Sequence, residues 1–473
     1  MGLRVSRKIG TLLLTIFLLL GLGSCDDLGN LELNISSNNQ VNIVYTVLDQ
    51  LYYEDLPLNL RRITTLEQLF EYTDPYTYIY KAESRDIERG EEYVGLGVTV
   101  SDHPLGLLVT NINIELDIDK EIYVGDIIYK VNDEELNSLT FEEKTNTLKG
   151  EEGDLKKLYL KRNNTDIVIT RTLGVIPFQS ISYQLFANKI GYIKINRFST
   201  DTSEKFNEAL NYLETEEISS LIIDVRDNGG GYLHAVTKIL ENFIVDENPY
   251  LYLYTVKSDE KVPYYSPLEE KKPYEIVALV NNNSASASEV LAGTLFKYGY
   301  DVFGEKTYGK DVFQSGIGLH QLSDIFSKDD ILNLTMGYWL LNDETRVTGG
   351  LEPTIEHLQT GLKALEYPYL IQEYNKGELN AVTYYKGQAN SQIRTYQYLL
   401  NNLNPFNYEA GLFGESTETV IKLYQIENSL EATGLLDVET QMKLIDYYRV
   451  LIKDSFYDSQ LNNLISYLVS NES

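Results

Sequence analysis

The feature that most restricts the fold of this 473-residue chain is an alternation of strand and helix patterns between residues 176 and 365. Apolar runs of strand length alternate there with segments that have helical apolar spacing. The strand runs are at 189–198, 219–228, 274–282 and 301–310, and the helical segments are at 202–213, after 236 and at 291–296. When a helix joins two strands, the chain crosses back along the sheet before the next strand begins. Neighbouring strands then run mainly parallel. The sequence therefore predicts an α/β core in this region.

Regions with other patterns flank this core, so the protein as a whole is predicted to be α+β. The length of the chain also predicts several domains. Residues 41–92 contain two helical apolar patterns, and residues 93–175 contain short strands around one amphipathic helix. Residues 388–446 contain three helical patterns joined by glycine-bearing turns, and residues 447–473 form the end of a last predicted helix that begins near Met442.

The first 24 residues have the pattern of a secretory signal peptide. Three basic residues, Arg4, Arg7 and Lys8, precede an apolar run over residues 9–22. Such a run is too short to span a bilayer comfortably, and small residues follow it, as at a cleavage site. We therefore expect that the chain is exported and that residues 1–24 are removed.

Cys25, the only cysteine of the chain, directly follows this segment. The sequence Leu22-Gly23-Ser24-Cys25 resembles the bacterial lipobox, whose cysteine is diacylated and becomes the mature N-terminus. The resemblance implies a lipid anchor at the outer face of the bacterial cell membrane, with residues 25–40 as a polar tether. The alternative is a small-residue cleavage site with an incidental cysteine. A chain with one cysteine has no internal disulfide.

The charge of the chain excludes some classes of partner. The formal net charge is −30, and removal of the three basic residues of the signal segment leaves about −33 (−30 minus 3). Nucleic-acid binding needs clustered lysine and arginine, which a strongly acidic chain does not favour. The excess of acidic over basic residues also disfavours a polybasic patch that would bind a membrane surface.

The β-rich region at 93–175 resembles a PDZ domain in the order of its strands and its single helix. The resemblance places the carboxylate-binding loop at Gly95, Leu96, Gly97 and Val98. In such a loop, backbone amides hold a C-terminal carboxylate while the next strand pairs with the peptide. The expected ligands are protein or peptide substrates with apolar C-terminal tails.

The three helical patterns at 388–446 resemble the peptidoglycan-binding fold. The matching positions are Tyr396-Gln397, Leu399, Gly411-x-Phe413-Gly414, Thr417, Tyr424-Gln425, Gly434-x-x-Asp437 and Thr440. Cell-wall peptidoglycan is the partner that this implies. The alternative is a three-helix dimerisation module, and both terminal helical regions could support a homodimer.

The stretch "NNNSASASEV", residues 281–290, lies between an apolar strand run and a helix. Ser286 and Glu289 fit the S-x-x-E capping box, in which each side chain satisfies a backbone amide of the helix start. The same turn would expose the Ser286 hydroxyl at a helix N-terminus, as a nucleophile requires. The helix-cap and nucleophile interpretations are compatible with each other. A nucleophilic serine also needs a general base to take its proton.

Two kinds of base are available to such a serine. The four histidines, His103, His234, His320 and His357, lie in no recognisable motif, although a histidine triad is not excluded. Lys310 is the other candidate, because it lies among apolar residues, and desolvation disfavours the charged form of a lysine. Gln314 would share a face with Lys310 if the stretch is helical, and could orient the amine without adding a charge.

A third candidate element is the turn "DNGGG", residues 227–231, which follows a strand. Successive glycines let a backbone approach a substrate closely and turn its amides inward. One of these amides, together with the amide that follows the nucleophile, would form an oxyanion hole. The alternative is a mobile loop.

In combination, these segments resemble the C-terminal processing, or tail-specific, serine peptidases, a Ser/Lys family with an inserted PDZ domain. The resemblance covers residues 41–356, and the matching motifs are DPYT (74–77), IGYIKINRF (190–198), DVRDNGGG (224–231), SASASE (284–289), GEKTYGK (304–310) and GGLEPTI (349–355). It implies that Ser286 is the nucleophile, Lys310 the general base and Gln314 the residue that orients the base. Gly230 and Ala287 would supply the oxyanion amides.

The chain departs from the family pattern at three places. The segment between Ser286 and Lys310 is one residue shorter than expected, near residues 297–300. Gly229 replaces the usual proline, which should loosen the glycine turn, and Lys149 replaces an arginine at the end of the PDZ helix. The last change leaves open whether a PDZ domain gates activity here as in some relatives.

The resulting prediction is an exported serine endopeptidase without a cofactor, because no His, Cys and Asp cluster has metal-ligand spacing. Two alternatives remain: a catalytically silent cell-wall PDZ scaffold and a peptidoglycan-directed hydrolase. The second rests only on the C-terminal module, since no glycosidase carboxylate pair or amidase zinc motif is present.

Overall fold

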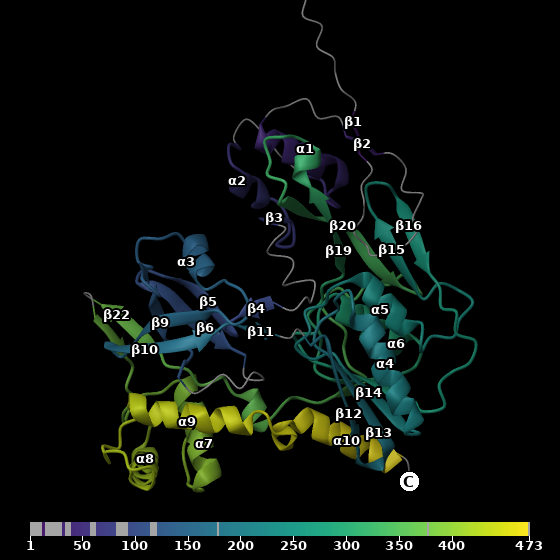
Figure 1. Cartoon of the computed structure of the whole chain (residues 1–473). Coiled ribbons are helices and arrows are strands. Elements are labelled where there is room, and N and C mark those ends of the chain that lie inside the picture. Colours follow the sequence, from purple (N-terminus) through teal and green to yellow (C-terminus); the bar gives the residue numbers. More distant parts are fainter. Residues whose placement is uncertain are drawn as a thin grey trace, which may run out of the picture. The chain divides into compact units, whose positions relative to one another are not determined.

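The computed structural model describes residues 39–56, 63–81, 93–113, 121–176, 179–375 and 378–471, and the backbone of 12–14 and 31–33 (Figure 1). Those two short segments, β1 (Leu12–Leu14) and β2 (Leu31–Leu33), pair antiparallel. Cys25 and nearly all of the predicted signal peptide and tether lie outside the described residues. The chain divides into two compact units, the first comprising 1–91, 179–358 and 468–473, the second 92–178 and 359–467.

The first unit contains the predicted α/β core. Its six-stranded sheet has the order β12-β13-β14-β17-β18-β21. The strands are β12 (Ile181–Phe186), β13 (Ile190–Ile195), β14 (Ser220–Asp224), β17 (Glu275–Val280), β18 (Asp301–Gly304) and β21 (Ile355–Glu356). β12 is antiparallel to β13, and all later pairs are parallel. This confirms the α/β fold class, since each parallel step requires a crossover.

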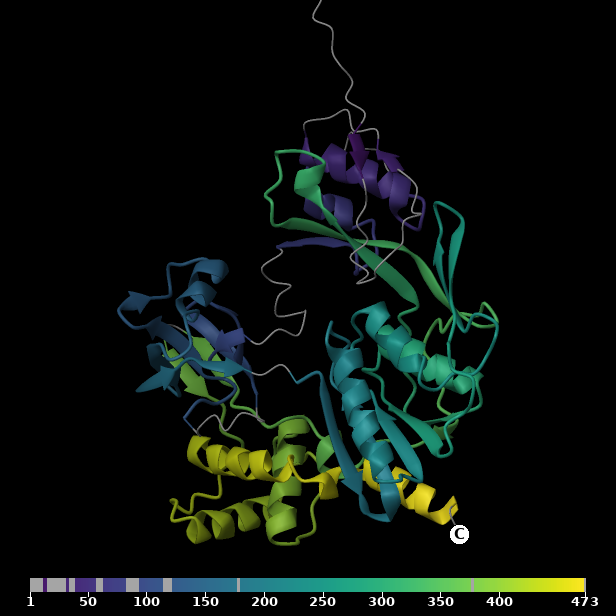
Figure 2. The same cartoon turned by 45° about the vertical axis from the view of Figure 1, so that its right-hand side comes forward.

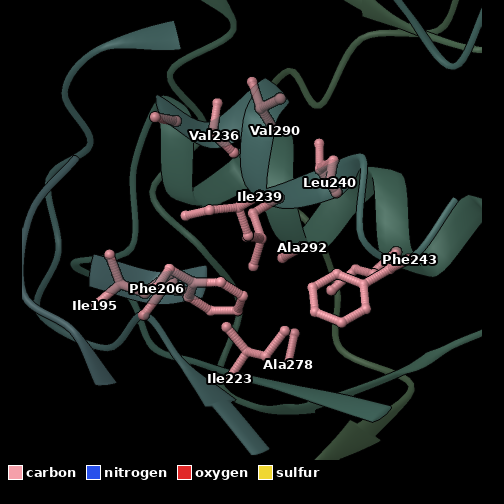
Figure 3. Packing of buried hydrophobic residues seen from close by; sticks show 14 of the residues in the cluster. Ile195, Phe206, Ile223, Val236, Ile239, Leu240, Phe243, Ala278, Val290 and Ala292 are labelled. Atoms are coloured by element: carbon pink, nitrogen blue, oxygen red, sulfur yellow. The ribbon is translucent and has the colours of Figure 1, made fainter. Parts of the chain in front are cut away.

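Three helices cover this sheet and pack side by side (Figure 1). They are α4 (Thr202–Thr215), α5 (Leu233–Leu240) and α6 (Ala287–Lys297), and the one-turn 3-10 helix η3 (Ala187–Lys189) precedes β13. Between helices and sheet, the rings of Phe206 and Phe243 meet edge to face with centroids 6.0 Å apart (Figure 3). Burial of each such side chain contributes about 1.5–3 kcal/mol, so this core fixes the strand ends that carry the site.

A second sheet in the same unit was not predicted. Its order is β16-β15-β20-β19, with β3 also paired to β20. The strands are β3 (Tyr78–Lys81), β15 (Leu251–Thr255), β16 (Glu260–Tyr264), β19 (Val312–Gly318) and β20 (Asp330–Leu341), with η4 (Leu319–Gln321) after β19. The predicted N-terminal helices, α1 (Gln40–Leu51) and α2 (Leu66–Phe70), share a buried apolar cluster with β19 and β20. The pairing of residues 78–81 with 330–333 joins segments about 250 residues apart, which local patterns do not reveal.

The second unit contains a β-rich module with the strand order β10-β9-β7-β6-β5. Its elements are β4 (Tyr93–Gly95), β5 (Val98–His103), β6 (Gly106–Ile112), β7 (Ile127–Val131), β8 (Glu134–Glu135), α3 (Phe141–Thr147), β9 (Leu155–Arg162), β10 (Thr165–Thr172) and β11 (Gly174–Ile176). The chain leaves the extended conformation between β4 and β5, at Gly97, whose φ is +70°. β4 therefore pairs with β11, while β5 pairs with β6.

The same unit ends in helices, seen in yellow-green to yellow in Figure 2. They are α7 (Ser391–Leu403), α8 (Glu415–Glu427), α9 (Val438–Leu451), η6 (Ser455–Tyr457) and α10 (Ser459–Asn471), preceded by η5 (Gly361–Ala364), β22 (Gln372–Asn375) and β23 (Glu378–Ala381). The residues of α10 from 468 on are assigned to the first unit. The expectation of one last helix was wrong. Asp454 caps η6 by accepting from the Phe456 amide, so the chain turns between α9 and α10. No described helix is both long and apolar enough to cross a membrane.

A polar network joins the β-rich module to α9. The Tyr123 ring lies between the guanidinium groups of Arg162 and Arg449, 4.4 Å and 4.7 Å from its centroid, and its hydroxyl donates to Asp446. Arg162 also forms a bidentate pair with Asp126, whose side chain is fully buried. Removing one partner of a buried pair leaves an uncompensated charge, whereas a stacked arginine contributes less.

We therefore expect Arg162→Ala to lower the free energy of unfolding by about 3–5 kcal/mol. Arg449→Ala should cost roughly 1–2 kcal/mol, because it removes a cation–π contact and a hydrogen bond to the Ile122 carbonyl. Arg394, which is exposed on α7, provides the matched control. Urea titrations of the three alanine variants would measure these differences, and equal values for Arg162 and Arg394 would contradict the prediction.

Candidate active site

The three candidate segments meet at one edge of the parallel sheet. The glycine turn follows β14, the serine turn follows β17, and the Lys310 loop follows β18. These strands are adjacent in the order β14-β17-β18 and run in the same direction. Loops at the carboxyl ends of neighbouring parallel strands form the usual ligand-binding edge of such a sheet. The fold therefore brings the three segments together.

Ser286 occupies the sharp turn between β17 and α6. Its φ of 55° and ψ of −114° are unusual for a residue other than glycine, and such strain persists only where the surroundings enforce it. Neighbouring serines hold the turn: the Ser284 hydroxyl donates to Val225 O and the Ser288 hydroxyl to Asn228 O, each at 2.8 Å. Both flanking serines thus serve as framework.

Glu289 connects the serine turn to the lysine loop. Its Oε2 accepts from the amides of Ser286 and Lys310, at 2.9 Å and 2.8 Å. Its Oε1 accepts from the Thr307 hydroxyl and the Gly309 amide, both at 2.6 Å. Burial raises the pKa of this carboxyl, against hydrogen bonds that lower it. Because all four neighbours are donors, the geometry matches an ionised carboxylate that fixes both loops.

Lys310 lies largely buried between these loops and the N-terminal segment. Desolvation lowers the pKa of its amine below the ordinary value of 10.5, while the charges of Asp74 and Glu289 act in the opposite direction. Its Nζ lies 4.2 Å from the centroid of the Tyr76 ring. The Lys310 amine is thus placed against the Tyr76 ring and is not hydrogen bonded to Ser286.

Tyr76 and Asp74 were not assigned to the site from the sequence, although they belong to the DPYT segment. The Asp74 backbone amide donates a hydrogen bond to the Tyr52 hydroxyl at 2.8 Å. Asp74 Oδ1 accepts from the Tyr76 amide, and its buried Oδ2 has no hydrogen-bond partner among the described residues. This segment therefore places one aromatic face and one carboxylate beside the lysine.

Gln314 lies in β19, so the helix suggested for its stretch is not present. Lys310 precedes β19, and a register shift falls between Phe313 and Gln314, so strand periodicity does not place the two side chains on one face. The Gln314 amide donates to the Thr335 hydroxyl at 3.2 Å, and Thr335 is in turn bonded to Thr77. No hydrogen bond joins Gln314 to Lys310, so its orienting role remains a prediction.

The two predicted oxyanion donors differ in availability. A Cβ at Gly230 would lie 2.8 Å from Ser286 Cβ and 3.0 Å from the Ala287 nitrogen, so this glycine contacts the nucleophile turn. However, the Gly230 amide donates to Asn228 Oδ1 at 2.8 Å. The Ala287 amide, in the first turn of α6, has no acceptor within the described residues. The Ala287 amide is therefore unpaired in this buried turn, whereas the Gly230 amide would first have to leave Asn228.

No histidine is hydrogen bonded to Ser286, and the His357 ring stacks on Phe303 with centroids 5.5 Å apart. The described part of the chain contains no cluster of three potential His, Cys, Asp or Glu metal ligands.

The predicted PDZ loop lies in the second unit, between β4 and β5. Gly97 has the left-handed φ described above, and its carbonyl accepts from the Asn113 amide at 2.9 Å. Leu96 and Val98 pack partly against the apolar core of the β-rich module.

Two regions of the chain match known protein families. Residues 189–357 match peptidase family S41, and residues 389–444 match a family described as a peptidoglycan binding domain. The chain is 30% identical over 359 residues to the "Carboxy-terminal processing protease CtpB" of Bacillus subtilis, which covers 73% of this chain and 70% of that protein. It is 26% identical over 438 residues to the "Probable CtpA-like serine protease" of Staphylococcus epidermidis, covering 91% and 85%. A solved "photosystem II D1 C-terminal processing protease" matches with a TM-score of 0.45 and 17% identity, over 68% of this chain and 94% of that chain.

Proposed function

The chain belongs to peptidase family S41, and from this premise we propose that it hydrolyses peptide bonds with a Ser286/Lys310 dyad. The single observation that carries the proposal is the Glu289 carboxylate. One of its oxygens accepts from the backbone amides of both Ser286 and Lys310. A structural lysine at the surface would need neither this anchoring nor burial.

The proposed reaction uses the two side chains in sequence. Neutral Lys310 Nζ takes the proton of the Ser286 hydroxyl as Oγ attacks the substrate carbonyl, and the Ala287 amide stabilises the oxyanion. Collapse of the tetrahedral intermediate breaks the C–N bond, and the lysine ammonium gives its proton to the leaving amine. Water then attacks the acyl-enzyme and loses a proton to Lys310, which passes it to Ser286 Oγ as the ester C–O bond breaks and the acid product leaves. Gly230 would contribute a second amide after release from Asn228, and Gln314 would orient the amine.

The other regions would deliver the substrate. We propose that the β-rich module is a PDZ domain that captures apolar C-terminal tails through residues 95–98. The C-terminal helices would bind peptidoglycan, and lipidated Cys25 would anchor the exported enzyme to the outer face of the membrane. A homodimer formed by the terminal helices is also proposed.

A peptide assay tests this function. We expect the full chain to cleave unfolded proteins and peptides with apolar C-terminal residues, and a fluorophosphonate probe to label Ser286. Amidation of the peptide C-terminus should slow cleavage at least about tenfold, because the loop amides lose their carboxylate. Equal rates for free and amidated tails would refute tail capture. Cleavage of purified sacculi but not of peptides would instead support the peptidoglycan hydrolase.

The pH profile of kcat/KM should reflect Lys310. Only the neutral amine acts as a base, so activity rises with pH through the Lys310 pKa, and this limb lies below pH 10.5. The Asp74 charge raises that pKa, so Asp74→Asn should move the limb to lower pH, by up to about one unit. Asp55→Asn, at a side chain that is 98% exposed, is the matched control. A limb unchanged by Asp74→Asn, or moved to higher pH, would contradict this assignment.

A further inference from the structure

The glycine turn next to Ser286 is restrained unevenly: Gly230 and Gly231 pair with the backbone of Phe198, whereas Gly229 has no such contact. Residues 229–231 are consecutive glycines, which have the greatest backbone freedom of any residue. A Cβ built at Gly229 would meet no atom within 4 Å, so packing does not hold this position. Its amide donates no hydrogen bond to the described residues. The start of the turn, at Gly229, therefore depends on restraints from neighbouring residues.

Hydrogen bonds from the serine segment provide that restraint. Asp227 Oδ1 accepts from the side-chain amides of Asn281 and Asn283, at 2.8 Å and 2.9 Å. In return, the Asp227 backbone amide donates to Asn281 Oδ1 at 3.0 Å. We call this group of three residues the Asp227 clamp. It joins the start of the glycine turn to the start of the serine turn.

Two further features show that the clamp is a specific arrangement. Asp227 has a φ of +61°, an uncommon conformation that asparagine and aspartate tolerate better than other side chains. Asn281 Oδ1 also accepts from the Asn283 amide at 3.1 Å, which fixes the middle of the run. Asn282, between the two, is exposed and makes no hydrogen bond to the described residues. Only the first and third asparagines of "NNN" therefore contribute.

Hydrogen bonds nearer the reaction centre depend on the position that the clamp sets. Asn228 O accepts from the Ala285 amide at 3.0 Å and from the Ser288 hydroxyl at 2.8 Å. Gly230 contacts Ser286 and Ala287 directly. These contacts hold the inner side of the turn, while the clamp holds its outer, solvent-facing side. Free rotation about the glycines is then limited from both sides.

We propose that Asp227, Asn281 and Asn283 are positioning residues that hold the glycine turn in register with Ser286 and so align the oxyanion donors. This inference rests on the proposed peptidase function and adds residues that touch neither substrate nor nucleophile. Oxyanion donors act only when they lie about 3 Å from the developing charge, and small displacements cost rate rather than substrate affinity. The clamp should therefore affect kcat more than KM.

The chain offers a matched pair of variants for the first test. Asn283→Ala removes one arm of the clamp at an exposed position, and Asn282→Ala makes the same change at the neighbouring residue. We expect Asn283→Ala to lower kcat about fivefold to twentyfold on a tail peptide, with KM within about twofold. Asn282→Ala should leave both values within about twofold. Equal kcat for the two variants would overturn the proposal.

A second substitution separates positioning from a general loss of stability. Gly229→Pro restricts the turn covalently; a Cβ at this position meets no atom within 4 Å, and the Gly229 amide donates no hydrogen bond to the described residues. In this background, Asn283→Ala should cost less than half the fold-change in kcat that it costs in the natural chain. The same fold-change in both backgrounds would refute the proposal. Gly229→Ala repeats the comparison with a weaker restriction.

Hydrogen exchange of the amides at 226–232 distinguishes this inference from the proposed function. We expect faster exchange in Asn283→Ala than in Asn282→Ala, and slower exchange once Gly229→Pro is added. If the natural chain cleaves no peptide, the peptidase proposal fails and the positioning role fails with it, whatever the exchange shows. If the chain is active but exchange and kcat are the same in both asparagine variants, only the clamp is refuted.

Discussion

Replacement of Ser286 or Lys310 by alanine is expected to lower kcat/KM on a tail peptide by at least about 1,000-fold. Without Ser286 no acyl-enzyme forms, and without Lys310 the hydroxyl has no base, since no histidine is bonded to it. Because the two groups act as a unit, the double variant should lose no more than either single variant. Peptide cleavage measured by mass spectrometry provides the comparison.

Lys310 is expected to support activity but to lower the stability of the fold, and a substitution can separate the two effects. Its folded pKa lies below the ordinary value of 10.5, so the unfolded chain binds more protons between these two values. Stability therefore rises as pH increases through that window, and at neutral pH the buried ammonium carries a desolvation cost. Lys310→Met should remove activity and raise the melting temperature.

Lys306→Met is the control for this substitution, because Lys306 is half exposed and pairs with the exposed Glu352. It should retain activity and leave the melting temperature nearly unchanged. A Lys310→Met variant that cleaves peptide at the natural rate would refute the dyad. A variant that is inactive but less stable than the natural chain would contradict the burial argument.

Glu289→Gln is the second substitution with a large expected effect. A glutamine has one acceptor oxygen and one donor amide, but Glu289 faces donors on both sides. At least one pair of donors would therefore lose its acceptor, either at Ser286 and Lys310 or at Thr307 and Gly309. Unsatisfied buried groups cost about 1–3 kcal/mol each, so we expect a loss of roughly 2–5 kcal/mol in stability.

The same substitution should lower kcat by about 100-fold, because the two loops lose their shared anchor. Thr307→Ser retains the hydroxyl and should keep activity within about threefold. Glu352→Gln, at an exposed carboxylate, controls for charge. Thermal melts and kcat measured on all three variants test the prediction. A Glu289→Gln enzyme with natural kcat would show that the carboxylate is not the anchor of the site.

Several properties were predictable from local sequence. The apolar runs at 189–198, 219–228 and 274–282 identified the central strands. The family matches confirm the resemblance to C-terminal processing peptidases, which was drawn from the motifs, and the resemblance of residues 388–446 to the peptidoglycan-binding fold. Ser286 and Glu289 were placed correctly at the start of α6. These features depend on side-chain spacing and on the chemistry of a helix start, which neighbouring residues determine.

Other properties depended on distant contacts. The sheet containing β3 and β20, the break between α9 and α10, and the strand conformation of Gln314 were missed. The network around Glu289 joins residues up to 21 positions apart, and the Asp227 clamp spans 54 and 56. No periodicity marks such pairs, although "DNGGG" and "NNN" are both visible in the sequence.

The sequence by itself determined the alternation of strands and helices in the α/β core, the family of the chain and the residue types that the chemistry requires. Only the tertiary structure decided that the loops after β14, β17 and β18 meet at one sheet edge, that Lys310 is buried against Tyr76, and that the Gly230 amide is held by Asn228. The physical reason is that desolvation and hydrogen-bond geometry arise from groups brought together by folding, and local spacing carries no record of them.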